Sequence, residues 1–238
     1  MKLRPLFILL AALTLSATVR SAPGPLIPQP TRLYGQFVFT TGIPVVYASG
    51  LEPLAEYIAD YIPLQRLDDR TWTAGAALRL SLDGTMDDES YRLTVTPQGV
   101  QVVGADYGGV FNGLQTLLQL LPPEVYTGQA TLPLAVDACR IEDAPRFHYR
   151  GMMLDVVRTW MDADRVKRHI DLLSHLKINK LHLLLSNDEG WRLEIKSHPE
   201  LTEIGAWRGG DSPVMPVYGK WDEKYGGFYT QEQAKEIV

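Results

Sequence analysis

The segment Arg150–Trp191 constrains the fold of this chain more than any other part of the sequence. It predicts a strand over residues 149–156, a helix that opens at Asp162, and an apolar strand over 180–185 of the kind buried in a parallel sheet. Strand, helix and strand in this order imply a right-handed crossover. Polar residues gather directly after each strand, where a (β/α)8 barrel keeps its active site. The segment therefore predicts the opening of a catalytic barrel.

The length of the chain bears on how much of that barrel we expect. A whole barrel needs roughly 250 residues, and the segment starts about 90 residues before the end of this 238-residue chain. Thr230 and Gln233 fit a capping box that opens a further helix, within which the chain stops. We therefore expect residues 144–238 to be the N-terminal part of a barrel that is incomplete here.

Residues 31–143 predict a small, separate α+β domain. Strands are expected within 36–48 and over 77–82, and a hairpin over 91–103. Apolar side chains at helical spacing predict two helices, over 51–62 and 110–121. Cys139, the one cysteine, lies in an apolar run and is expected to be a buried thiol. The predicted fold class is an α+β N-terminal domain followed by the start of a (β/α)8 TIM barrel.

The N-terminus predicts export from the cytoplasm. Two basic residues precede an apolar run over residues 6–15, and small residues follow it through Ala22. This is the layout of a secretory signal peptide, and the run is shorter than the ~20 residues of a membrane span. We expect a signal peptide at 1–22 and a Pro-rich linker at 23–30. The protein would then be periplasmic or secreted, or membrane-anchored if the leader stays uncleaved.

The sequence argues against nucleic acid as a partner and against a bound metal or cofactor. The formal charge is −5 and there is no basic run, so nucleic acid is not expected as a partner. No paired-histidine motif, phosphate-binding loop or dinucleotide-binding glycine motif is present. We therefore expect neither a metal site nor a cofactor. The oligomeric state stays open.

Arg158 is the candidate substrate-binding residue. It follows the first barrel strand, and its guanidinium fork can donate to two neighbouring hydroxyls of a sugar. The alternative is a surface salt bridge to Asp155 or Asp162.

Three polar residues, Asn187, Asp188 and Glu189, form a candidate supporting loop after the second strand. Acids at this place could act as general acid and base. The alternative is a helix cap or a polar turn. Trp191 could stack on a sugar face or could be a core or rim residue.

Two motifs, Ala144–Arg158 and Asn179–Arg192, resemble the β-N-acetylhexosaminidases of glycoside hydrolase family 20. Residues 199–209 and 226–231 are similar as well, and residues 91–106 and 113–122 resemble the small domain that precedes the barrel in that family. The resemblance implies release of terminal β-linked N-acetylglucosamine or N-acetylgalactosamine from glycans. It implies a retaining, substrate-assisted reaction without metal, in which the 2-acetamido oxygen of the sugar is the nucleophile.

The resemblance also implies roles for particular residues. Arg158 falls on the arginine that grips hydroxyls of the terminal sugar. An adjacent Asp-Glu pair performs the catalysis in this family, and we expect that pair beyond Val238, so no catalytic residue is assigned within the chain. Asp188 and Glu189 belong to a different motif, which supports the catalytic network.

The chain departs from the family pattern at three places. Asn187 replaces an acid, Leu184 stands where a histidine is common, and Thr159-Trp160 stand where His-Phe is common. These departures motivate an alternative function, an inactive relative that acts as a carbohydrate-binding protein. A third alternative is a different barrel glycosidase with the same small domain.

Overall fold

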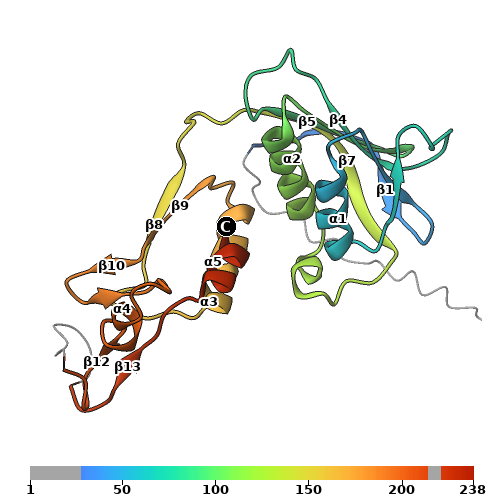
Figure 1. Cartoon of the computed structure of the whole chain (residues 1–238). Coiled ribbons are helices and arrows are strands. Elements are labelled where there is room, and N and C mark those ends of the chain that lie inside the picture. The colour runs from blue at the N-terminus through green and yellow to red at the C-terminus, as the bar shows by residue number, and fades with distance from the viewer. Residues whose placement is uncertain (1–27, 214–220) are drawn as a thin grey trace, which may run out of the picture.

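The chain folds into two parts that meet at one junction (Figure 1). The computed structural model describes residues 28–213 and 221–238. The predicted signal peptide and most of the predicted linker therefore lie outside the described residues. The first part is built on a seven-stranded sheet, and the second begins with a strand, a helix and a parallel strand.

The sheet of the first part has the strand order β1-β7-β5-β6-β4-β2-β3. Its strands are β1 Thr31–Phe39, β2 Pro44–Tyr47, β3 Gln65–Asp68, β4 Leu78–Leu82, β5 Tyr91–Thr96, β6 Gly99–Gly104 and β7 Leu134–Asp143. Strands β6, β4, β2 and β3 run parallel, whereas β1, β7, β5 and β6 pair antiparallel in turn. The predicted hairpin is confirmed as β5 and β6. Strand β3 was not predicted from the sequence, because its residues QRLD show no apolar alternation.

Two helices, α1 (Glu52–Tyr61) and α2 (Tyr107–Leu120), cover one face of this sheet (Figure 1). On β5 every second residue is buried beneath them, namely Tyr91, Leu93 and Val95, and the residues between are half-exposed. This alternation is typical of a sheet with one covered face. A short 3-10 helix, η1 (Pro123–Thr127), follows α2.

Helix α2 packs directly against the sheet at Gly113, where only a glycine fits. A Cβ atom at this position would lie 2.5 Å from Val102 Cγ1 and 3.1 Å from Tyr91 Cδ2. Asp106 caps the start of the helix, and its side chain accepts a hydrogen bond from Gly109 N at 2.8 Å. A cap and a glycine contact together fix where α2 starts and how deeply it packs.

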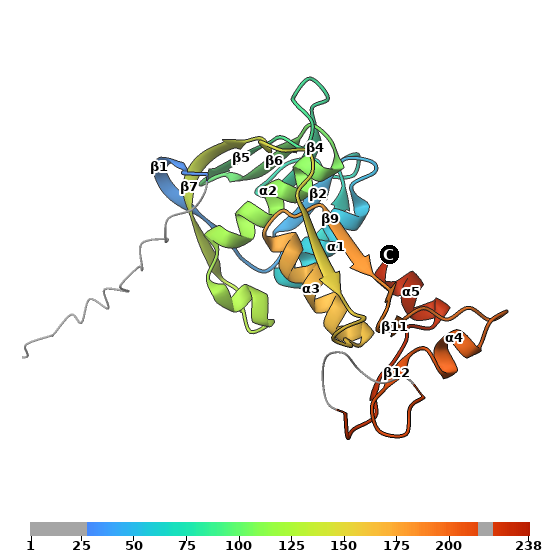
Figure 2. The same ribbon diagram turned by 90° about the vertical axis from the view of Figure 1, so that its left-hand side faces the viewer.

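The second part opens with β8 (Gly151–Asp155), α3 (Ala163–His175) and β9 (Lys180–Leu184). Strands β8 and β9 lie side by side and run in the same direction (Figure 2). Their register places Gly151 opposite Lys180 and Asp155 opposite Leu184. The predicted strand, helix and strand are thus confirmed. Among the described residues the barrel is not closed.

The predicted burial of the second barrel strand is wrong. Along β9 exposed and half-buried residues mix, and His182 is exposed. The reason is that β9 pairs only with β8 within the described part of the chain, so much of its surface is uncovered.

The remaining elements are short and lie beyond the C-terminal end of β9. They are β10 Ser186–Asn187, β11 Gly190–Trp191, α4 Glu200–Glu203, β12 Trp207–Arg208, β13 Tyr225–Gly226 and α5 Gln231–Ile237. Strand β10 pairs with β11, and β12 with β13. The predicted capping box is confirmed, because Thr230 Oγ1 accepts from Gln233 N at 3.1 Å and Thr230 N donates to Gln233 Oε1 at 3.0 Å.

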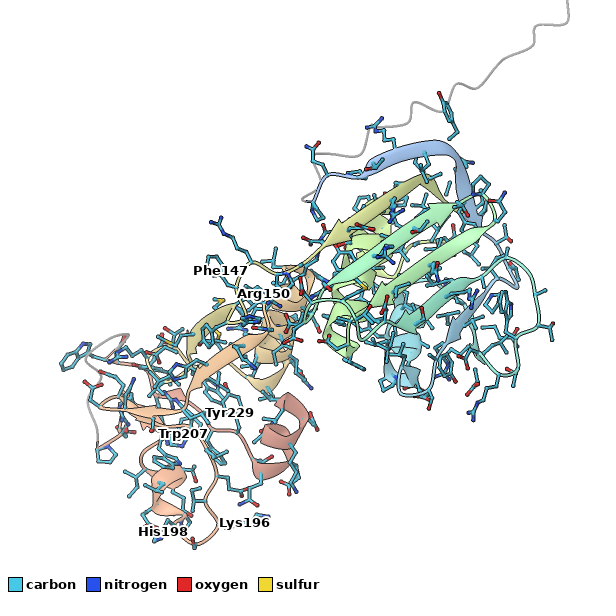
Figure 3. The ribbon with its side chains drawn as sticks, turned by 90° about the horizontal axis from the view of Figure 1, so that it is seen from above. Phe147, Arg150, Lys196, His198, Trp207 and Tyr229 are labelled. Carbon is cyan, nitrogen blue, oxygen red and sulfur yellow. The ribbon has the colours of Figure 1, made fainter. Side chains whose placement is uncertain are left out.

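Polar contacts hold the two parts together at the junction, where Figure 3 labels Arg150. The Arg150 guanidinium forms an ion pair with Glu89, which precedes β5. Asn179 Nδ2 donates to the same carboxylate at 2.9 Å. Lys177 Nζ donates to Tyr91 Oη at 2.9 Å. The small domain therefore anchors the N-terminal ends of β8 and β9, opposite the ends where a barrel places its site.

Candidate functional site

Asp155, the last residue of β8, organises the turn that carries Arg158. Its Oδ1 accepts hydrogen bonds from the backbone N–H groups of Val157 at 2.9 Å and Arg158 at 3.0 Å. Its Oδ2 accepts from Arg158 Nη1 at 2.6 Å. Desolvation raises the pKa of Asp155, but these hydrogen bonds and the nearby guanidinium outweigh it and leave the pKa lowered. Asp155 is therefore an ionised anchor at neutral pH.

Arg158 is held between the ends of the two barrel strands. Besides its contact with Asp155, its Nη2 donates to Asp188 Oδ1 at 3.3 Å, in the loop after β9. The Asp188 side chain is 72% exposed and that of Asp155 only 20%, so the ion pair of Arg158 with Asp155 is stronger than its ion pair with Asp188. The Arg158 side chain is 41% exposed. The salt bridge to Asp155 that the sequence left as an alternative is thus present, and it fixes the guanidinium at the barrel mouth.

In the predicted supporting loop, Asn187–Glu189, the two acidic side chains lie in different surroundings. Asn187 Oδ1 accepts from Glu189 N at 2.8 Å, which makes a polar turn. Asp188 is exposed, whereas Glu189 is 2% exposed. Because one carboxylate lies in water and the other is buried, the loop does not present two acids to one shared ligand. Asn187 Nδ2 is buried without a hydrogen-bond partner among the residues that the structure describes.

A cleft of about 450 Å³ opens beside Arg158. Its lining combines aromatic rings with charged groups, from Arg158, Thr159, Trp160, Trp207, Glu223, Lys224, Tyr225 and Gly226. Lys224 Nζ lies 4.9 Å from the centre of the Trp207 ring. Apolar faces with a few fixed polar groups are the composition of a small-molecule site. A sugar, which has apolar C–H faces and a rim of hydroxyls, matches both features.

The aromatic residue proposed from the sequence is not the one that lines the cleft. Trp191 is half-buried and donates from Nε1 to Leu193 O at 2.5 Å, outside the cleft lining. Trp160 and Trp207 line it instead, and Trp207 is labelled in Figure 3. Trp160 could have been found from its place two residues after Arg158. Trp207 could not, because it reaches the cleft through the pairing of β12 with β13.

Trp160 is fixed by tight packing. Its ring centre lies 4.8 Å from that of Tyr229, and the Arg192 guanidinium lies 5.5 Å from it. A Cβ atom on Gly227 would lie 2.4 Å from Trp160 Cε2, so only glycine allows this approach. Tyr229 Oη donates to Met161 O at 2.5 Å. The ring is therefore a rigid wall of the cleft.

The described residues, 28–213 and 221–238, show neither a metal centre nor a membrane span. No group of three or more His, Cys, Asp or Glu side chains there could hold a metal ion. No helix in residues 28–213 or 221–238 has the length and apolar character needed to cross a membrane. Cys139 is buried in the core of the sheet, as expected from the sequence, and burial raises the pKa of its thiol to about 11.

The fold and the cleft define a class: an α+β domain joined to the opening of a barrel, with a sugar-compatible cleft at the strand ends. Family models agree with it. The family described as glycosyl hydrolase family 20, catalytic domain, matches residues 147–238, and the same family's domain 2 matches residues 24–144. The chain belongs to glycoside hydrolase family 20.

Curated proteins that are similar in sequence to this chain carry hexosaminidase names. A β-hexosaminidase from Vibrio furnissii is 39% identical over 220 residues, which are 90% of this chain and 34% of that protein. A β-N-acetylhexosaminidase from Cellulomonas fimi is 36% identical, over 85% of this chain and 39% of that protein. The chain thus spans little more than a third of the length of these curated relatives.

Solved structures are similar over the same span. A family 20 exo-β-N-acetylglucosaminidase from Vibrio harveyi, in complex with N-acetylglucosamine, gives a TM-score of 0.77 at 35% identity, over 91% of this chain and 34% of that chain. A Streptomyces plicatus N-acetyl-β-hexosaminidase gives 0.74 at 36% identity, over 88% and 41%.

Proposed function

We propose that the protein carrying this chain is a β-N-acetylhexosaminidase that releases terminal β-linked N-acetylglucosamine or N-acetylgalactosamine from glycans. One observation carries the proposal: Arg158 is fixed at the ends of two parallel barrel strands, beside an aromatic-lined cleft. Supporting it, the relatives at 39% and 36% identity are named as hexosaminidases. A structural neighbour also holds N-acetylglucosamine.

In this proposal the cleft binds the terminal sugar. The Arg158 guanidinium donates to its hydroxyls, and Asp155 holds the guanidinium in place with a 2.6 Å contact. Trp160 and Trp207 offer ring faces to the apolar C–H surface of the sugar. Binding at this site is thus directional at the rim and apolar at the wall.

The chemistry that we propose is retaining and substrate-assisted. The 2-acetamido oxygen of the sugar attacks the anomeric carbon while the glycosidic C–O bond breaks and the departing oxygen takes up a proton. Water then attacks the anomeric carbon and restores the acetamido group, so that no carboxylate of the protein forms a covalent bond. An adjacent Asp-Glu pair orients the acetamido group and transfers protons. We assign this pair to residues outside 1–238, and we assign no proton transfer to Asp188 or Glu189.

The test uses the full-length protein that carries this chain and a chromogenic N-acetylglucosaminide. Arg158→Ala is expected to lower kcat/KM about 10- to 100-fold, because a charged hydrogen bond contributes roughly 1.5–3 kcal/mol. Arg165→Ala is the matched control, since the Arg165 side chain is 61% exposed and its Nε lies 4.0 Å from Asp162 Oδ2, at the limit of an ion pair. An unchanged kcat/KM for Arg158→Ala would remove Arg158 from the site.

The 238-residue chain alone is expected to be inactive in the same assay. Turnover by the purified 238-residue chain would show that the proton-transferring groups lie within it, and would overturn our assignment of the acid pair.

A carbohydrate-binding protein without hydrolytic activity is the second candidate, favoured by Asn187 in place of an acid. The two candidates differ in one outcome. Quenching of tryptophan fluorescence by N-acetylglucosamine, together with no hydrolysis by the full-length protein, would support binding alone. Hydrolysis would exclude it.

We also propose that residues 1–22 direct export, because basic residues, an apolar run and small residues follow one another there. Mass spectrometry of the protein recovered from the periplasm or the medium tests this. A mature N-terminus near Ala22 is expected. An intact leader in the membrane fraction would indicate the anchored alternative.

A further inference from the structure

Arg192 is a fully buried cation in the second part of the molecule. Its side chain is 0% exposed and is the largest among the fully buried side chains of the described residues. Its guanidinium donates to the carbonyls of Val156 at 3.1 Å, Val157 at 2.6 Å and Gly227 at 3.0 Å, and also to that of Ala206. The guanidinium thus joins backbone from three separate segments.

Each of these segments carries part of the cleft lining. Val157 directly precedes Arg158, Ala206 directly precedes Trp207, and Gly227 directly follows Gly226. Every segment bonded to Arg192 is therefore one residue away from a group that lines the cleft. Arg192 itself does not line the cleft.

The packing around Arg192 leaves little freedom for these segments to move. A Cβ atom on Gly226 would lie 2.0 Å from Ala206 O and 3.1 Å from Arg192 Nη1. The φ angle of Gly226 is +136°, which favours glycine. The guanidinium also faces the Trp160 ring at 5.5 Å. The guanidinium is thus closely surrounded by backbone and by an aromatic ring.

No other side chain can make this set of contacts. A buried guanidinium is costly, and desolvation, followed by the nearby Arg208, lowers the pKa of Arg192. An arginine nonetheless stays protonated in proteins, and its donors spread over a planar fork. A lysine has three donors at one point and could not reach carbonyls in three segments at once.

We propose that Arg192 is a positioning residue of the sugar site, which fixes Arg158, Trp160 and Trp207 relative to one another without touching the sugar. The inference rests on the proposed function. It states that the shape of the cleft depends on one buried guanidinium. Loss of the fork lets the three segments separate, and the terminal sugar then binds more weakly.

The experiment compares Arg192→Lys with Arg165→Lys in the full-length protein. Arg192→Lys is expected to lower kcat/KM by about 100-fold, mainly through KM, because small misplacements of binding groups are costly. Arg165→Lys is expected to leave both constants unchanged. In Arg192→Ala, added guanidinium at millimolar concentration is expected to restore part of kcat/KM, whereas urea, which is planar and neutral, is expected not to.

The outcomes separate this inference from the proposed function. If the wild-type protein hydrolyses no N-acetylhexosaminide, the proposed function fails. If the wild type is active and Arg192→Lys keeps the wild-type KM, the positioning role is overturned. Unfolding of both Arg192 variants, followed by circular dichroism, would assign Arg192 to stability alone and would overturn it too.

Discussion

The ion pair between Glu89 and Arg150 is expected to couple the two parts of the molecule. It lies at the junction, and the side chains are only 27% and 17% exposed. Arg150 also donates to Lys177 O at 2.7 Å and Phe147 O at 2.9 Å, so its guanidinium is held in place. Glu89→Gln removes the negative charge and leaves an amide oxygen that can still accept from Asn179 Nδ2. The substitution therefore removes the ion pair and its hydrogen bond with Arg150, while the contact with Asn179 can remain.

We expect Glu89→Gln to lower the free energy of unfolding by about 2 kcal/mol. Hydrogen bonds to charged groups contribute roughly 1.5–3 kcal/mol. Breaking a fully buried pair costs roughly 3–5 kcal/mol, and this pair keeps some access to water. With a urea dependence of about 2 kcal/mol per molar, the unfolding midpoint would fall by ~1 M.

The assay is urea unfolding followed by tryptophan fluorescence, arranged as a double-mutant cycle with Glu89→Gln and Arg150→Met. The matched pair is Arg140 and Glu142, whose side chains are 55% and 53% exposed on the open face of the sheet. Its coupling is expected to be too small to resolve. If the two junction substitutions are additive, or if the exposed pair couples as strongly, burial does not decide the strength of these pairs and the reasoning is wrong.

Three further predictions concern single residues. Burial lowers the pKa of His175 below 6.5, so the folded protein favours the neutral ring. The stability that neutral His175 contributes is therefore present above pH 6.5 and is lost as the pH falls. Between pH 7.5 and 5.5 the urea midpoint should drop less in His175→Gln than in the wild type. Gly113→Ala should destabilise the chain by roughly 1–3 kcal/mol through the contact with Val102, and Val102→Ala should recover part of that loss in the urea midpoint of the double variant. The Cys139 thiol, with its pKa raised to about 11 by burial, should react with a thiol reagent at pH 8 only at the rate of unfolding, and rapid labelling of the native chain would contradict its burial.

Local patterns in the sequence predicted much of the secondary structure correctly. The hairpin of β5 and β6, the helices α1 and α2, and the capping box at Thr230 depend on residues that are near one another in the chain. The same holds for Arg158, because the end of a strand can be found from its apolar run and the polar residue that follows. Family resemblance was carried by contiguous motifs of this kind.

Long-range pairing decided the rest. Trp207 and Tyr225 join the cleft only because β12 pairs with β13, and both strands are two residues long. Asp188 and Glu189 are neighbours in sequence, yet one is exposed and the other buried. Arg192 is the last residue of the motif Asn179–Arg192, but arginine is mostly exposed in proteins, and no local pattern predicted its burial.

The sequence by itself therefore determined the main helices, the hairpin, the strand, helix and strand of the second part, the family, and the position of Arg158 at a strand end. Only the tertiary structure decided which aromatic rings wall the cleft and what holds them there. The physical reason is that helical and strand periodicity act over a few residues. The carbonyls bound by Arg192 come from segments as far apart as Val156 and Gly227, which only folding brings together.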